Sequence, residues 1–151
     1  MRTVYTCTFR IPDSAIDMNG HVGNLEYIRW MQEIATAHSG SEGWTIDRYR
    51  NLRTCWVVRS HHIEYLRPAY AGDVIDLHTW IADFGEWQSP RKYLFTKSGD
   101  PRIIVRAETV WVYVDAVTGR PKRTPEEFMT SFDVVAGEEE ALRLAGKSRS
   151  G

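Results

Sequence analysis

One long amphipathic helix dominates the pattern of the sequence. From Asn24 to Ser39, charged and polar residues alternate with apolar residues that recur every three or four positions. The apolar set is Tyr27, Ile28, Trp30, Met31, Ile34 and Ala35. This spacing is typical of a helix that buries one broad face. We expect Asn24 to be its N-cap, and the serines and glycine at 39–41 to end it.

Segments rich in β-formers surround this helix. Residues 3–11 predict a first strand, and four more strands are predicted at 55–67, 74–83, 91–97 and 103–115. Residues 44–54 predict an irregular or short helical connector. Consecutive strands joined by short turns favour an antiparallel sheet, against which the helix must bury its apolar face. The predicted fold class is α+β, in one domain.

The composition excludes several classes of protein. The formal net charge of the 151 residues is -1, which gives no general attraction to nucleic acid or to an anionic membrane. The two cysteines, Cys7 and Cys55, form no disulfide framework. No apolar run is long enough for a signal peptide or a membrane span. We therefore expect a cytoplasmic protein. The histidines lack metal-ligand spacing, so no metal is expected.

The turn before the helix contains the candidate chemistry. Asp17 lies seven residues before Asn24, where a helix N-terminus presents backbone N–H groups without intrahelical partners. Gly20 and Gly23 leave the backbone free to approach a substrate. A carboxylate beside such donors suits acyl transfer. The alternative is structural: Asp17 and Asn19 cap the turn, with His21 packed beside them.

The residues of this turn spell D-x-x-G-H-V-x-N-x-x-Y, from Asp17 to Tyr27. The motif resembles the active-site segment of hotdog-fold thioesterases of the 4-hydroxybenzoyl-CoA thioesterase type. Weaker similarities continue at Pro68-Ala69 and at 118–121, so the resemblance covers roughly residues 4–132. It implies a hotdog domain at 1–136, in which a curved antiparallel sheet of about five strands wraps one long central helix. Residues 137–151 would be a polar tail, partly disordered at its end.

The resemblance also implies an activity and its residues. The expected reaction is hydrolysis of an acyl-CoA to a carboxylic acid and CoA, with Asp17 as nucleophile or general base. Backbone N–H groups around Asn24 would polarise the thioester carbonyl, and the side chains of His21 and Asn24 would shape the turn. The expected substrate-binding residues are Gly20, Val22, Gly23 and Tyr27. No cofactor is expected beyond the CoA of the substrate.

Two rival functions stay open. One is a thioesterase for acyl groups on acyl-carrier protein, since plant-type relatives have a similar segment. The other is a non-catalytic hotdog protein that binds acyl-CoA. Whichever of the three functions holds, we expect a homodimer or homotetramer, because the helix would leave one apolar sheet face uncovered. That face contains Trp56, Val110, Val112 and Val114.

Basic residues are spread along the strand ends. They are Arg59, Arg67, Arg91, Lys92 and Lys97. As a group they are most simply explained as solvated positions on the sheet. If the ligand is CoA, some of them would meet its phosphates, because guanidinium groups pair well with phosphate oxygens.

Overall fold

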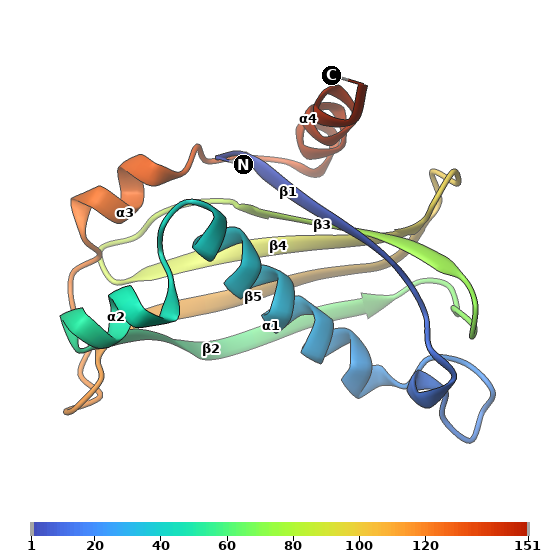
Figure 1. Cartoon of the computed structure of the whole chain (residues 1–151), viewed down its shortest axis with the longest axis horizontal. Coiled ribbons are helices and arrows are strands. Elements are labelled where there is room, and N and C mark those ends of the chain that lie inside the picture. The colour runs from blue at the N-terminus through green and yellow to red at the C-terminus, as the bar shows by residue number, and fades with distance from the viewer. Residues whose placement is uncertain (1, 151) are drawn as a thin grey trace.

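A five-stranded antiparallel sheet forms the body of the protein, as Figure 1 shows for the computed structural model. The structure describes residues 2–150, apart from the side chains of 147–150. The strand order is β1-β3-β4-β5-β2. The strands are β1 (Val4–Arg10), β2 (Thr54–Tyr65), β3 (Val74–Ile81), β4 (Gln88–Lys97) and β5 (Ile103–Asp115). The predicted α+β class and the five strands are confirmed, and the architecture is that of a hotdog fold.

Helix α1 (Asn24–Ser41) lies across one face of this sheet. Its Trp30, Met31 and Ile34 are buried in the main core. The sheet contributes alternate residues of three strands, namely Ile75, Leu77, Tyr93, Phe95, Val105 and Ala107. Burying one large apolar side chain contributes about 1.5–3 kcal/mol, so this shared face holds the helix on the sheet. The predicted amphipathic helix is confirmed.

Helix α4 (Glu138–Ser150) packs on the opposite face of the sheet, over β1 and β3. Trp80 and Leu94 alternate with the residues that face α1, and they pack with Ala141 and Ala145 of α4. The disorder expected at the end of the tail falls on residues 147–151, which lie outside the described side chains. That expectation stays a prediction.

Two short helices close one end of the molecule. Helix α2 (Ile46–Leu52) occupies the predicted connector, and helix α3 (Glu126–Ser131) follows β5. A 3-10 turn, η1 (Asp13–Ala15), precedes the Asp17 turn at the other end. The N-terminus of α1 therefore lies beside the Asp17 turn, and its C-terminus lies beside the two short helices (Figure 1).

Two details differ from the sequence-based prediction. Strand β4 begins at Gln88 rather than at residue 91. Pro90 lacks an N–H but still pairs with Val110 within the ladder, so the strand extends beyond the predicted start. The four residues expected on one uncovered sheet face do not share a face: Trp56 pairs with Tyr113 and packs against Phe128 of α3. On the other face Val114 is buried, while Val110 and Val112 are only half-buried.

Candidate active site

The Asp17 turn is closed by its own backbone. The Asp17 N–H donates to the His21 carbonyl at 2.9 Å, and the Gly20 N–H donates to the Asp17 carbonyl at 3.0 Å. Gly20 has a φ of 84°, a left-handed conformation that glycine adopts without strain. A Cβ at Gly20 would meet no described atom within 4 Å. Glycine is therefore needed here for its backbone conformation rather than for close packing.

Two hydrogen bonds fix this turn to the rest of the fold. The Val22 N–H donates to the Ala69 carbonyl at 2.9 Å, and the Gly23 N–H donates to the Ala15 carbonyl at 3.0 Å. Ala69 is fully buried in the loop between β2 and β3. The position of the turn therefore depends on that loop.

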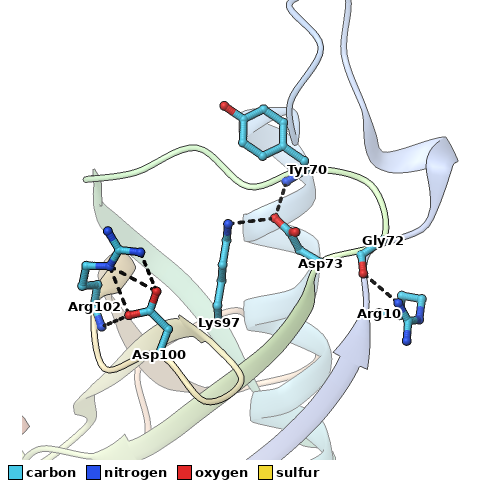
Figure 2. A network of polar contacts seen from close by, with 7 residues as sticks. All are labelled: Arg10, Tyr70, Gly72, Asp73, Lys97, Asp100 and Arg102. Atoms are coloured by element: carbon cyan, nitrogen blue, oxygen red, sulfur yellow. Dashed lines mark hydrogen bonds and ion pairs between the residues drawn. The ribbon is translucent and has the colours of Figure 1, made fainter.

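Figure 2 shows how the loop is held in place. The Asp73 carboxylate accepts from the Tyr70 N–H at 2.9 Å and pairs with Lys97 of β4 at 3.3 Å. Arg10 of β1 donates to the Gly72 carbonyl at 2.8 Å. Contacts from two strands thus fix the loop that carries Ala69, and through it the Asp17 turn.

The two carboxylate oxygens of Asp17 have different surroundings. Oδ1 accepts from the Asn19 N–H at 2.8 Å, so this oxygen does cap the turn. Oδ2 has no hydrogen-bond donor among residues 2–150. A Cβ built on Gly23 would lie 4.0 Å from Oδ2 and 3.6 Å from the Asp17 Cβ. The free oxygen therefore lies beside the residue that starts α1.

The start of α1 presents two open donors. Gly23 is the N-cap, with φ −68° and ψ 144°, and it has no side-chain capping bond. The prediction that Asn24 caps the helix is wrong: Asn24 is the first helical residue, with an exposed side chain. In the described part of the chain, the N–H groups of Asn24 and Leu25 have no acceptor. Such N–H groups favour an oxyanion.

The other predicted site residues are half-buried or buried, and they are His21, Val22 and Tyr27. His21 is half-buried, and its Nδ1 donates to the Val22 carbonyl at 3.3 Å. The side chains of Val22 and Tyr27 are buried in the main core. Burial raises the pKa of Tyr27 to about 12, with smaller contributions from Tyr65 and Asp73, so its phenol stays neutral. Within the described residues, no three potential metal-ligating side chains come together.

The opposite end of α1 contains a cavity of about 630 Å³ that the sequence did not predict. It lies between the C-terminal half of α1, α2, α3 and the starts of β2 and β4. Its wall includes five aromatic side chains, those of Trp44, Tyr49, Trp56, Trp111 and Phe128. Arg91 also lines it and is only 4% exposed. The expectation that Arg91 is solvated is therefore wrong: its strand position faces α1 rather than water.

Among residues 2–150, no helix is long and apolar enough to cross a membrane.

Solved structures with this fold are numerous. A hypothetical protein of Staphylococcus aureus, solved in complex with CoA, superposes with a TM-score of 0.81 at 20% identity. The superposition covers 93% of this chain and 92% of that one. A 1,4-dihydroxy-2-naphthoyl-CoA thioesterase from Synechocystis gives a TM-score of 0.78 at 16% identity, over 85% and 94% of the two chains. These similarities show the fold.

Curated relatives include plant enzymes. The oleoyl-acyl carrier protein thioesterase 2 of Arabidopsis thaliana is 28% identical over 127 residues, which are 80% of this chain and 34% of the relative. A palmitoyl-acyl carrier protein thioesterase of Gossypium hirsutum is 30% identical over 128 residues, covering 74% of this chain and 30% of the relative. The chain thus spans about a third of the length of these relatives.

The family comparison covers most of the sequence. Residues 11–132 match the model of the thioesterase-like superfamily. This range contains the Asp17 turn, all of α1 and four of the five strands. The chain belongs to the thioesterase-like superfamily.

Proposed function

We propose that the protein is an acyl-CoA thioesterase of the 4-hydroxybenzoyl-CoA type, with its active site at the Asp17 turn. One observation carries the proposal: the unpartnered Oδ2 of Asp17 lies beside the helix start, where the N–H groups of Asn24 and Leu25 have no acceptor in the described residues. This arrangement supplies a carboxylate and an oxyanion site within one turn of chain.

The chemistry follows from these two parts. The thioester carbonyl accepts hydrogen bonds from the two N–H groups, and the positive end of the helix dipole stabilises the oxyanion that forms. Asp17 acts on the carbonyl carbon in one of two ways. As a base it removes a proton from water, whose oxygen attacks. As a nucleophile it forms an anhydride, which water then hydrolyses. In both cases the C–S bond breaks and CoA leaves as the thiol.

The other residues of the turn hold this geometry. Val22 joins the turn to the core, His21 donates to the Val22 carbonyl, and Gly20 provides the left-handed corner of the turn. Gly23 keeps the space beside Oδ2 free of a side chain. Tyr27 fixes the first turn of α1 through edge contacts with Trp30 and Phe95. The reaction needs no cofactor beyond the CoA of the substrate.

A second candidate is a thioesterase for acyl groups on acyl-carrier protein. The names of the two plant relatives favour it. A third candidate is a non-catalytic protein that binds acyl-CoA at the same site and does not hydrolyse it.

The unpaired edge of β2 favours assembly into a homodimer or homotetramer. β2 pairs only with β5 in the sheet order, which leaves one side of a 12-residue strand without a partner in the described chain. Long free edges of this kind promote pairing with another chain. Met18 and Leu25, which flank the Asp17 turn, are 98% and 80% exposed. We expect light scattering at micromolar concentration to give at least twice the mass of one chain, whereas a monomer would contradict the assembly.

Replacing the acid tests the proposed function. Asp17→Asn keeps the size of the side chain and its acceptor for the Asn19 N–H, but removes the charge and basicity. Loss of one such group costs about 10²- to 10⁴-fold in rate, measured as release of CoA thiol. Asp13→Asn is the matched control, because Asp13 is an exposed carboxylate four residues away in η1. Thiol release by Asp17→Asn at the wild-type rate would refute the assignment.

A further inference from the structure

Arg91 is a buried cation at the far end of α1 from Asp17. It lies on β4, opposite Ile81 of β3 and Thr109 of β5. Its Nη1 donates to the Nδ1 of His38 at 2.8 Å and to the Oγ1 of Thr79 at 3.2 Å. The other N–H groups of Arg91 have no acceptor in the described residues. Arginine has five N–H donors, so most of its capacity is unused.

None of the groups bonded to Arg91 carries negative charge. His38 accepts through Nδ1, so that nitrogen carries no proton and the ring is neutral. Thr79 is a neutral hydroxyl. Burial lowers the pKa of Arg91, and the groups that oppose this shift are the phenols of Tyr93 and Tyr49. Burial raises the pKa of Tyr49 to about 12, so that phenol is also neutral. A buried charge without an opposite charge is costly to a fold.

The cavity next to Arg91 has space for the missing charge. Its volume is about 630 Å³, within the range of small-molecule sites. Arg50 and Arg53 also line it, and no aspartate or glutamate of the described chain does. Arg53 has a φ of 56°, which makes it the one non-glycine residue with positive φ among residues 2–150. Arg50 is exposed and its Nη1 lies 3.8 Å from Asp47 Oδ1, so Arg91 is the buried cation of this cavity. A buried guanidinium with unused donors, beside aromatic side chains and no lining carboxylate in the described residues, indicates an anionic ligand with an apolar body.

We propose that this cavity binds an aliphatic or aromatic carboxylate, with the Arg91 guanidinium pairing with its carboxylate group and the aromatic wall packing on its apolar part. Guanidinium and carboxylate match in shape and form two parallel hydrogen bonds. A monoanion suits the single deeply buried cation, while Arg50 and Arg53 attract the ligand from the other parts of the wall. Arg91 is thus a specificity-determining binding residue.

The site lies far from the Asp17 turn within one protomer. His38 is fourteen residues beyond Asn24, so a helix rise of ~1.5 Å per residue separates them by about 21 Å. Figure 1 shows the Asp17 turn and α2 at opposite ends of α1. The carboxylate therefore belongs either to a free acid or to the far end of a long acyl group. Binding of the acid does not depend on thioester hydrolysis.

Direct binding tests the proposal. Decanoate and decan-1-ol share an alkyl chain and differ in charge, and the tryptophans of the wall provide a fluorescence readout beside calorimetry. We expect wild type to bind decanoate at least tenfold more tightly than decan-1-ol. Arg91→Met should weaken decanoate binding by about 10- to 100-fold and leave decan-1-ol binding within about threefold, because one charged hydrogen-bond pair is lost. Arg102→Met, which removes an exposed arginine from the β4–β5 turn, is the control and should bind as wild type does.

A second variant keeps the test valid if Arg91→Met does not fold. Arg53→Gly removes a cavity arginine and relieves the positive φ, so it should fold at least as well as wild type. We expect it to weaken decanoate binding about two- to fivefold, as for a partly exposed charge. Equal affinity for decanoate and decan-1-ol, no binding of either, or displacement of decanoate by equimolar inorganic phosphate would each overturn the proposal.

Hydrolysis of matched thioesters identifies the source of the carboxylate. An acyl group must be long enough to span about 21 Å, so the matched pair is the mono-CoA thioester of octadecanedioic acid, which carries a carboxylate at the far end of its acyl group, and stearoyl-CoA, which does not. A higher kcat/KM for the octadecanedioic thioester that is lost in Arg91→Met would assign the carboxylate to the acyl group. Equal kcat/KM values together with decanoate binding would assign it to a free acid. Decanoate binding together with no thiol release from these thioesters or from a panel of aliphatic and aromatic acyl-CoAs would support the carboxylate site and refute the proposed function.

Discussion

The two ends of α1 contain sites built in opposite ways. At the N-terminal end, Asp17, Gly23 and Asn24 come from one short stretch of chain, and backbone groups do most of the work. At the C-terminal end, the cavity combines residues from 35 to 128, and one buried side chain carries the charge. A local site leaves a motif in the sequence, whereas a site assembled by the sheet does not. The comparison can be tested by changing backbone groups at one end and side chains at the other.

After that of Asp17→Asn, the largest expected effect comes from removing a backbone donor at the N-terminal end. Asn24→Pro deletes the N–H of the first helical residue, a position where proline is favoured and where no described acceptor is lost. Gly23 already has the extended ψ of 144° that suits a residue before proline. We expect kcat for thiol release to fall about 10²- to 10³-fold with the fold retained.

Asn24→Ala is the control for this change, because it removes the side chain and keeps the N–H. If backbone donation is what matters, Asn24→Ala retains most of the activity. Equal rates for Asn24→Ala and Asn24→Pro would show that the N–H of residue 24 does not stabilise the oxyanion.

Substitutions of two glycines, one at each end of α1, should change stability by smaller amounts and in opposite directions. Gly20→Val places a β-branched residue at a φ of 84°, which we expect to cost about 1–2 kcal/mol of unfolding free energy. Gly40→Ala, in the last turns of α1, adds a Cβ that meets nothing within 4 Å. It should stabilise the protein by about 0.5–1 kcal/mol. Urea denaturation measures both, and destabilisation by Gly40→Ala would contradict this account of the helix end.

The smallest expected effect is a pH dependence of stability that arises in the β4–β5 turn, which contains Asp100 and Arg102. A side-chain hydrogen bond from Arg102 is the main cause that lowers the pKa of Asp100 from near 3.8 to about 2 (Figure 2). A lowered carboxyl pKa stabilises the folded state above the unfolded pKa, and this contribution is lost as pH falls from about 4 through 2. Arg102 is exposed and Asp100 is only half-buried, so the effect is small and weakened by salt.

Asp100→Asn isolates this contribution. The urea midpoint of the variant should fall less steeply than that of wild type between pH 4 and pH 2. Parallel curves for the two proteins would show that the Asp100–Arg102 pair does not contribute to stability.

The sequence predicted the local features of the fold well. The helix period and the β-rich runs predicted α1 and five strands, because each signal lies within one element. Its errors concern contacts between distant elements. Trp56 was expected on an open face because α3, whose Phe128 covers it, was not predicted. The acidic first turn of α3 after Pro125 is a helix-start signal that would have revealed it.

The same contrast holds for the candidate sites: the local site was predicted, and the site assembled from distant elements was not. The Asp17 turn was predicted as a unit, although Gly23 and not Asn24 caps the helix, since glycine accepts a cap position without a side-chain bond. The prediction that Arg91 is solvated was wrong because the sequence of a strand alone does not show which face of the strand meets water. Its burial depends on His38 of α1 and Thr79 of β3, which are 53 and 12 positions away in the sequence. No local pattern records those contacts.

One measurement tests the central claim most directly: thiol release by the wild-type protein from the same acyl group carried on CoA and on acyl-carrier protein. Because the identity of the acyl group is unknown, a panel of aliphatic and aromatic acyl groups is assayed with wild type and Asp17→Asn in parallel. We predict that wild type releases thiol from acyl-CoA and that Asp17→Asn binds the same thioester but releases at least a hundredfold less. Release from the carrier-protein thioester alone would favour the rival substrate. Binding of acyl-CoA by wild type with no thiol release from either carrier would contradict the assignment of Asp17 as a catalytic nucleophile or general base.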